Sequence, residues 1–171
     1  SAYDAFVHET YTQVPDETRQ ALSDILSELV GEEDADPYQY IPRVLEYVST
    51  SARYDLNTPA VPDGEDFVSW FLHDSETGYC VHYATAATIL LRCLGVPARY
   101  VTGYYTDVYE NEWTTVTSDD AHAWVEIYLN GIGWLRDDPT PAADTPAQTA
   151  PEEPIAAPIE PADNQPKDTP P

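Results

Sequence analysis

One run of apolar residues predicts a buried helix. From Val81 to Leu94 the residues are apolar or small on nearly every face, with one late charge at Arg92, and this pattern is typical of a helix inside a domain. Gly95 follows the run and Pro97 comes two residues later, as is common at a helix end. The helix is therefore expected to begin at about Cys80.

An alternating segment predicts a strand with one face in the core. From Ala121 to Leu129 every odd position is apolar, and the even positions include His122. Asn130-Gly131 then indicates a hairpin turn. A two-residue turn would place Asp137 on the face of His122, whereas a three-residue loop or a bulge would place Asp138 there. The residues alone leave both alternatives open.

Further periodic segments predict the rest of the domain. Asp63 or Asp66 is expected to cap one helix, and Pro42 either kinks another or begins it. Helices followed by antiparallel strands indicate an α+β fold class. The pattern predicts helices over residues 3–11, 15–31, 36–48 and 63–72, and strands over residues 98–106 and 113–117.

Cys80 is a candidate nucleophile. A free cysteine is most often a small buried apolar residue, but in the first turn of a helix the unpaired N–H groups and the helix dipole favour a thiolate. A thiolate can attack an amide or ester carbonyl, an imidazole can accept and return the proton, and a carboxylate can fix the tautomer. With His122 and one aspartate, Cys80 therefore suggests acyl transfer through a thioester.

The composition excludes some partners. Asp and Glu total 31 against 7 Lys and Arg, a formal net charge of −24, so nucleic acid is not expected as a partner, since phosphate binding needs a cationic surface. The acidity fits a soluble exported domain, a high-salt environment or the attraction of cationic substrates. The only lysine is Lys167, so a cross-linking enzyme of this kind would take its acceptor lysine from another protein.

No cofactor is expected. Cys80 and Cys93 would lie about 20 Å apart on one helix at about 1.5 Å per residue, which is too far for a disulfide, and Cys93 is interpreted as a buried apolar residue. His73 and His82 lack the close ligand spacing of zinc sites, and the acidic residues lack that of a calcium loop. We therefore expect no metal and no other required group.

The last part of the chain differs in composition. From Ala142 onward proline, alanine, threonine and acids dominate, which indicates a spacer without a packed core. The expected division is a domain over residues 1–141, with a helical part at 1–52 and a catalytic core at 53–141, and a linker over residues 142–171. A chain that starts at Ser1 and lacks methionine is expected to be a piece of a longer protein.

Several motifs resemble the bacterial branch of the transglutaminase-like superfamily. They lie in the same order and at similar spacing, and the resemblance covers about residues 3–141. The segment around Asp66-Phe67-Val68 also resembles the one that precedes the nucleophile in membrane-anchored bacterial members. The motifs are Gly78-Tyr79-Cys80, Leu94-Gly95-Val96-Pro97-Ala98-Arg99-Tyr100-Val101, Ala121-His122-Ala123-Trp124-Val125-Glu126, Gly133-Trp134 and Asp138-Pro139-Thr140-Pro141.

The resemblance implies a papain-like site. In it Cys80 is the nucleophile, His122 the base and general acid, and Asp138 the residue that orients the imidazole, which favours the bulged hairpin. Animal members carry an oxyanion-binding tryptophan in an Arg-Trp-Asp context; here Arg53-Tyr54-Asp55 stands in that place, so Tyr54 is the oxyanion candidate through its hydroxyl. The resemblance also implies an extracytoplasmic domain in the cell envelope, with a membrane anchor in flanking sequence.

Three functions follow as hypotheses. The first is a cysteine acyltransferase or peptidase that acts on peptide or protein amides. The second is a catalytically silent scaffold or binding module of a membrane protein, which keeps the fold. The third is a hydrolase of cell-wall peptides.

Overall fold

Helix α6 (Cys80–Cys93) forms the centre of the fold in a computed structural model that describes residues 1–31 and 35–142. Eight of its 14 residues are buried, which confirms the buried helix expected from the sequence. The helix begins at Cys80 and ends before Gly95, whose φ of 85° lies in the left-handed region. The backbone N–H of Val96 then bonds to the carbonyl of Leu91 at 2.9 Å and closes the last turn.

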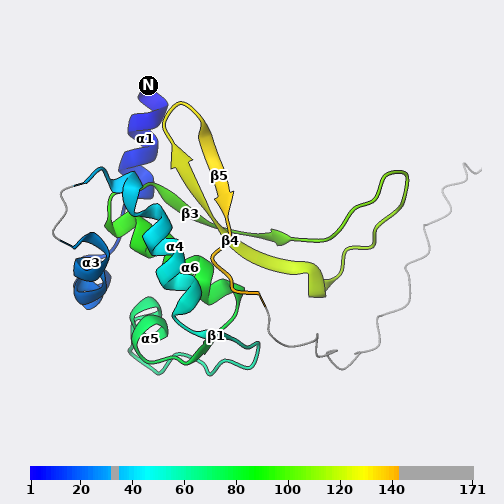
Figure 1. Cartoon of the computed structure of the whole chain (residues 1–171), viewed down its shortest axis with the longest axis horizontal. Coiled ribbons are helices and arrows are strands. Elements are labelled where there is room, and N and C mark those ends of the chain that lie inside the picture. Colours follow the sequence, from blue (N-terminus) through cyan, green and yellow to red (C-terminus); the bar gives the residue numbers. More distant parts are fainter. Residues whose placement is uncertain (32–34, 143–171) are drawn as a thin grey trace, which may run out of the picture.

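A three-stranded antiparallel sheet packs against α6 (Figure 1). The buried side chains of Ala123, Val125 and Ile127 occupy the odd positions of the central strand, so the predicted alternation is confirmed. Val125 and Ile127 form one apolar cluster with the buried face of the helix. The strands, in the order in which they pair, are β3 (Ala98–Tyr104), β4 (Ala121–Leu129) and β5 (Gly133–Asp137).

The β4–β5 hairpin has a three-residue loop. Leu129 pairs with Gly133, so residues 130–132 form the loop, and Gly131 takes a φ of 78° in it. This register places Asp138 beyond Asp137 on the face that carries His122. Of the two alternatives left by the sequence, the three-residue loop is therefore the observed one.

Helices from the first half of the chain surround α6. Helices α4 and α5 pack directly on it (Figure 1), and the Phe71 ring meets the buried Tyr83 ring edge-on at 5.2 Å. The elements are α1 (Ala2–Tyr11), α2 (Asp16–Ala21), α3 (Ser23–Val30), the 3₁₀ helices η1 (Pro37–Tyr40) and η2 (Ser118–Asp120), α4 (Ile41–Thr50), α5 (Phe67–His73), and a short parallel pair, β1 (Arg53–Tyr54) with β2 (Thr77–Gly78).

Helix α1 lies against the β4–β5 hairpin (Figure 1). The Tyr11 ring meets the Trp134 ring edge-on at 4.9 Å, and the Tyr128 hydroxyl donates to a carboxylate oxygen of Asp4 at 2.6 Å. This hydrogen bond, followed by burial, raises the pKa of Tyr128 to about 12. Aromatic residues thus dock this helix on the hairpin.

The structure decides where two helices begin, which the sequence had left open. Pro42 lies in the first turn of α4, where its missing N–H costs no intrahelical bond, so it belongs to the helix start. Asp66 caps α5, since its carboxylate accepts from the N–H groups of Val68 and Ser69 at 3.0 and 2.9 Å.

Two predictions were wrong. The helix expected over residues 15–31 is divided at Leu22 (φ −102°, ψ 11°) into α2 and α3, because the bend brings this fully buried side chain into the core. The strand expected over residues 113–117 does not form. Its β-prone side chains have no neighbouring strand to pack on, and strand propensity reflects such packing.

The α+β fold class is confirmed. Among the described residues, no helix combines the length and the apolar character needed to cross a membrane. The predicted linker, apart from Ala142, lies outside the described residues.

Candidate active site

Strand β2 leads the chain directly to Cys80. In the parallel pair, Tyr54 lies opposite Gly78, and the N–H of Asp55 donates to the Gly78 carbonyl at 2.8 Å. The chain then passes through Tyr79 in an extended conformation and enters α6 at Cys80. The small β1–β2 pair thus brings Tyr54 beside the start of the helix.

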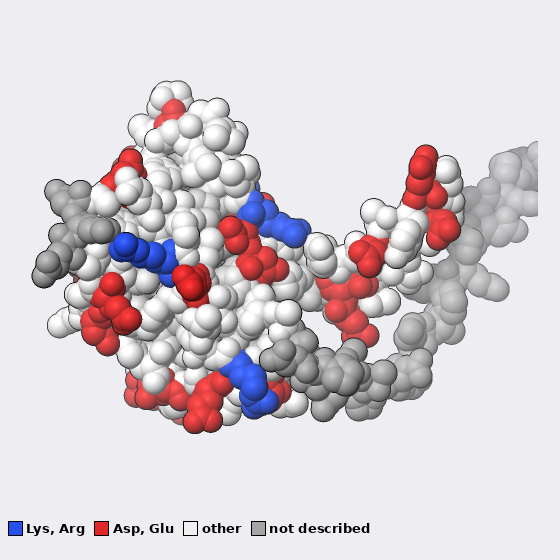
Figure 2. Space-filling view, in the orientation of Figure 1, with Lys and Arg blue, Asp and Glu red and all other residues white. Residues whose placement is uncertain are grey.

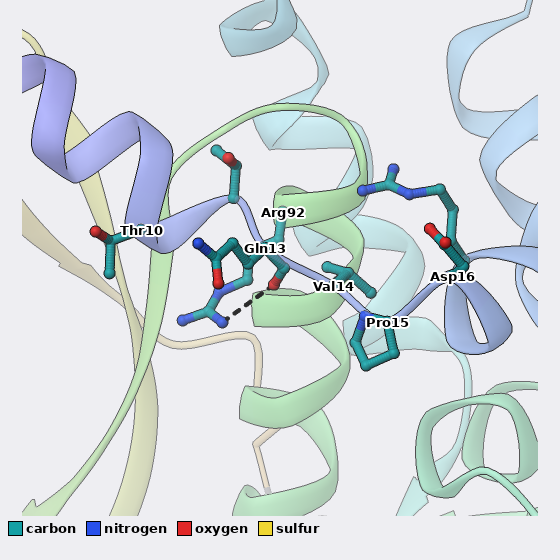
Figure 3. A pocket seen from close by; sticks show the side chains of 8 residues that line it. Thr10, Gln13, Val14, Pro15, Asp16 and Arg92 are labelled. Carbon is teal, nitrogen blue, oxygen red and sulfur yellow. Dashed lines mark hydrogen bonds between the residues drawn. The ribbon is translucent and has the colours of Figure 1, made fainter.

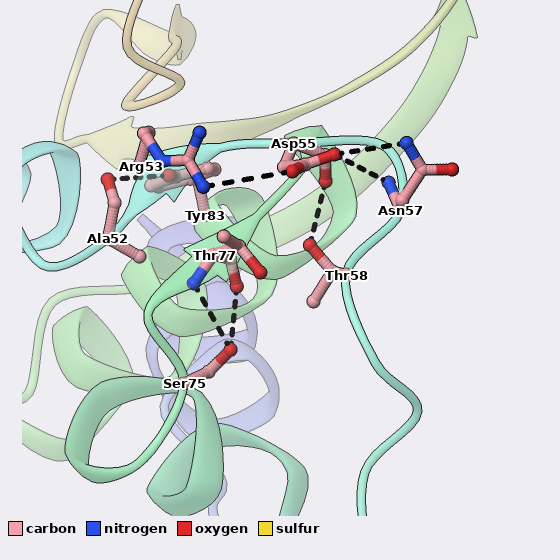
Figure 4. Close-up of polar contacts among 8 residues, drawn as sticks. All are labelled: Ala52, Arg53, Asp55, Asn57, Thr58, Ser75, Thr77 and Tyr83. Carbon is pink, nitrogen blue, oxygen red and sulfur yellow. Dashed lines mark hydrogen bonds and ion pairs between the residues drawn. The ribbon is translucent and has the colours of Figure 1, made fainter.

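Hydrogen bonds support both strands of this pair (Figure 4). The Tyr83 hydroxyl of α6 donates to the carbonyl of Ala52 at 2.8 Å, just before β1. The Thr58 hydroxyl donates to the Asp55 carbonyl at 2.7 Å, and the Ser75 hydroxyl to the Thr77 carbonyl at 2.7 Å. Polar contacts on both sides therefore hold the segment that positions Cys80.

His82 fixes the residue before Cys80. Its Nδ1 accepts the backbone N–H of Tyr79 at 3.3 Å, and its ring, only 4% exposed, stacks on the ring of Phe67 at 5.0 Å. Burial lowers the pKa of His82, which keeps Nδ1 available as an acceptor. At Gly78 a Cβ atom would lie 2.5 Å from Cε2 of Phe71, so any larger residue there would force the buried Phe71 ring to shift.

His122 and Asp138 form a close pair. Nε2 of His122 lies 2.6 Å from Oδ2 of Asp138, while Oδ1 of Asp138 accepts the backbone N–H of Thr140 at 3.1 Å. A carboxylate accepts only, so the imidazole proton belongs on Nε2. Among the described residues Nδ1 of His122 makes no hydrogen bond, and this nitrogen is left to exchange a proton with a thiol.

Cys80 and His122 are not joined by a hydrogen bond in the described part of the chain. Both side chains are partly exposed. Catalytic hydrogen bonds are often long without substrate and shorten when it binds. The structure thus brings together His122 with Asp138, and Cys80 with Tyr54, as two pairs on neighbouring elements.

Two tyrosines lie within the electrostatic influence of Cys80. Burial, followed by the charge interaction with Cys80, raises the pKa of Tyr54. Burial, then Cys80 and Tyr79, likewise raises the pKa of Tyr100 on β3. Both phenols therefore remain protonated and able to donate a hydrogen bond at neutral pH.

Sequence reasoning missed two features: the contact of His82 with the Tyr79 backbone and the electrostatic interaction of Tyr100 with Cys80. His82 follows Cys80 by two residues, and its place in the first turn of the helix is the one signal that could have suggested contact with the preceding backbone. For Tyr100, the sequence offered only its place in a strand, because the distance from β3 to Cys80 depends on how the sheet packs on α6.

A hollow lies at the other end of α6, away from Cys80 (Figure 3). It has a volume of about 620 Å³ and includes Gln13, Arg19 and Arg92 in its lining. Both guanidinium groups donate to backbone carbonyls: Arg19 to Cys93 at 2.6 Å and Arg92 to Ala98 at 2.8 Å. In the described part of the chain no three His, Cys, Asp or Glu side chains lie close enough to hold a metal ion.

Comparison with known proteins places this chain in a family. The family model of the Transglutaminase-like superfamily matches residues 24–139. The YebA protein of Bacillus subtilis (strain 168) is 31% identical over 148 residues, which are 82% of this chain and 20% of that protein. A protein-glutamine gamma-glutamyltransferase of Pseudomonas aeruginosa is 44% identical over 89 residues, which are 51% of this chain and 13% of that protein. The chain thus spans about a fifth or less of these two relatives.

A solved structure agrees with the sequence matches. The periplasmic domain of TgpA from Pseudomonas aeruginosa superposes with a TM-score of 0.62 at 33% identity, over 79% of this chain and 49% of that domain. The matched family region contains the sheet, α6 and the residues Cys80, His122 and Asp138. This chain belongs to the transglutaminase-like superfamily.

Proposed function

We propose that this domain is a cysteine acyltransferase that acts on glutamine side chains of peptides or proteins. The observation that carries the proposal is the 2.6 Å contact between Nε2 of His122 and Asp138, which leaves Nδ1 for the thiol of Cys80 at the start of α6. The gamma-glutamyltransferase name of the Pseudomonas aeruginosa relative supports glutamine as the acyl donor.

In the proposed first step, Nδ1 of His122 takes the thiol proton of Cys80. The sulfur attacks the amide carbon, a C–S bond forms, and the C–N bond breaks as His122 returns the proton to the nitrogen. Ammonia leaves and a thioester remains on Cys80. A primary amine then displaces the sulfur to form a new amide, or water does so to form a carboxylate.

The proposed oxyanion site combines two donors. Cys80 is the first residue of α6, so its backbone N–H has no acceptor within the helix. The Tyr54 hydroxyl is the second donor, and the raised pKa of Tyr54 supports this role because the phenol keeps its proton. Removal of one such donor commonly costs about 3 kcal/mol of transition-state stabilisation.

We also propose an extracytoplasmic location. The periplasmic origin of the similar TgpA domain supports it. The formal charge of −24 suits an exported, soluble domain. A membrane anchor in sequence that flanks this chain belongs to the same proposal.

Amine incorporation tests the function. The 171-residue chain is incubated with a glutamine peptide and a fluorescent primary amine, and products are identified by mass spectrometry. We expect incorporation by the wild type and by Cys93→Ala, the matched control at the other cysteine, but not by Cys80→Ala. Equal incorporation by Cys80→Ala would contradict the proposal, as would a wild type that neither transfers nor hydrolyses glutamine amides.

A further inference from the structure

The segment between β3 and η2 forms an arm, residues 105–117, that projects from the rest of the domain (Figure 1). At its base the N–H of Tyr105 donates to the carbonyl of Asp120 at 2.8 Å. At its tip the N–H of Glu112 donates to the Tyr109 carbonyl at 3.3 Å, and Asn111 turns the chain with a φ of 62°. The arm thus stands away from the core and offers both of its sides to a partner.

Large apolar side chains cover the arm. Trp113 has its full surface in solvent, Val108 is 79% exposed, and Tyr105, Tyr109 and Val116 are also exposed. These five are among twelve exposed large apolar residues in the described chain, so they are concentrated in a short segment. Exposed tryptophan and tyrosine residues of this density are typical of a binding surface.

The charge of the arm has one sign. Asp107, Glu110 and Glu112 lie on it and are exposed, and Asp119 and Asp120 follow at its base. The sequence contains no lysine or arginine from residue 100 to residue 135. Figure 2 shows acidic side chains along the arm, whereas the basic side chains visible in this view lie on the body of the domain.

The arm begins beside the proposed catalytic histidine. Gly103 of β3 pairs with His122, and the rings of Tyr105 and His122 lie 6.3 Å apart. At the base of the arm the guanidinium of Arg136 lies 5.0 Å from the Tyr105 ring. A polypeptide bound along the arm would therefore reach the site from the side of His122.

We propose that the arm binds a lysine-rich segment of a polypeptide and presents one of its amines as the acyl acceptor. Carboxylates attract ammonium groups over a distance, and the faces of tryptophan and tyrosine bind them at contact. The catalytic part of this proposal rests on the proposed acyl transfer. It also agrees with the absence of lysine from the chain before Lys167.

Charge complementarity selects this occupant over two others. Residues 143–171 contain six acids and one lysine, so the chain's own tail would be repelled by the arm. Two copies of the chain would repel each other, because each carries a formal charge of −24. A cationic partner would be attracted to the arm instead of repelled by it.

Peptide binding tests the proposal without any reaction. Fluorescence polarisation measures binding of a labelled 12-residue peptide with six lysines, and of its counterpart with six glutamates, to the 171-residue chain. The arm variant combines Asp107→Asn, Glu110→Gln and Glu112→Gln. The control variant combines Glu9→Gln, Glu28→Gln and Glu46→Gln, which removes equal charge from exposed sites on α1, α3 and α4.

We expect the lysine peptide to bind the wild type and the control variant with similar Kd, and the arm variant about tenfold more weakly. Trp113→Ala should weaken binding severalfold at 300 mM salt, where charge steering is screened. Equal loss in both triple variants, binding of the glutamate peptide, or self-association of the wild type in light scattering would overturn the proposal. Because binding is measured without turnover, intact binding by an inactive chain would refute the acyl transfer and leave the arm's ligand class standing.

Discussion

Replacement of Asp138 by asparagine keeps the shape of the side chain but removes its charge and one of its two hydrogen-bond acceptors. The carboxylate now accepts from two groups, Nε2 of His122 and the N–H of Thr140. An amide of the same shape can accept with its oxygen but must donate with its nitrogen. In Asp138→Asn one of the two N–H groups therefore faces another donor.

Each orientation of the introduced amide has a cost. If its nitrogen faces His122, the imidazole proton must move to Nδ1, which then cannot accept the thiol proton. If its nitrogen faces Thr140, that backbone N–H loses its acceptor. An unsatisfied donor costs about 1–2 kcal/mol where water partly reaches it. At about 1.4 kcal/mol for each factor of ten, turnover should fall about 5- to 30-fold.

The assay is kcat/KM for amine transfer to a glutamine peptide, with Asp137→Asn as the matched control. Asp137 precedes Asp138, is exposed, and accepts the Asp138 N–H at 2.8 Å through one oxygen. An amide oxygen can do the same, so Asp137→Asn should stay within about twofold of wild type. Equal effects of the two variants would refute the reasoning.

Four further predictions concern the segment that carries the thiol and the strand beside it. His82→Leu removes the acceptor of the Tyr79 N–H and should reduce turnover more than His82→Asn, which keeps one. Burial lowers the pKa of His82 in the folded chain, so as the pH falls this imidazole is protonated in the unfolded chain before it is protonated in the folded one. The free energy of unfolding in urea should therefore decline below about pH 6.5. The decline should be smaller in His82→Asn, which has no imidazole to protonate. Gly78→Ala places a Cβ 2.5 Å from Phe71 and should cost about 1–3 kcal/mol of folding free energy, measured as a lower Tm. Tyr54→Phe removes an oxyanion donor and should lower kcat about 100-fold while thiol alkylation by iodoacetamide stays unchanged.

Particular outcomes would contradict these four predictions. Equal turnover of the two His82 variants would show that the acceptor is unimportant, and an identical urea stability profile against pH would show that His82 does not titrate in this range. An unchanged Tm in Gly78→Ala would mean that Phe71 moves freely. A Tyr54→Phe variant with the kcat of the wild type would remove the hydroxyl from the mechanism.

Local patterns were enough to predict the helix that begins at Cys80 and the strand that carries His122. The apolar run after Cys80 and the alternation around His122 depend on burial, and burial leaves a period in the sequence. The two tested alternatives at Pro42 and in the hairpin loop were both present in the sequence reasoning. In each case packing selected one of two locally allowed geometries.

The rest depends on contacts between distant segments. The β1–β2 pair joins residues 53–54 with 77–78, and each strand is too short to show a period. Leu22 divides a helix because the core requires its side chain, although residues 15–31 read as a single helix. Residues 113–117 have the composition of a strand but no neighbouring strand, and propensity alone cannot supply one.

The central claim is that His122 activates Cys80, and the alkylation rate of Cys80 tests it most directly. Iodoacetamide is applied to the folded chain at pH 6, and mass spectrometry follows both cysteines, with Cys93 as internal reference because burial raises its pKa. We predict that Cys80 reacts at least about tenfold faster than Cys93 in the wild type, and that His122→Ala lowers the Cys80 rate about tenfold. A Cys80 that reacts as slowly as Cys93, or at an unchanged rate in His122→Ala, would contradict the account.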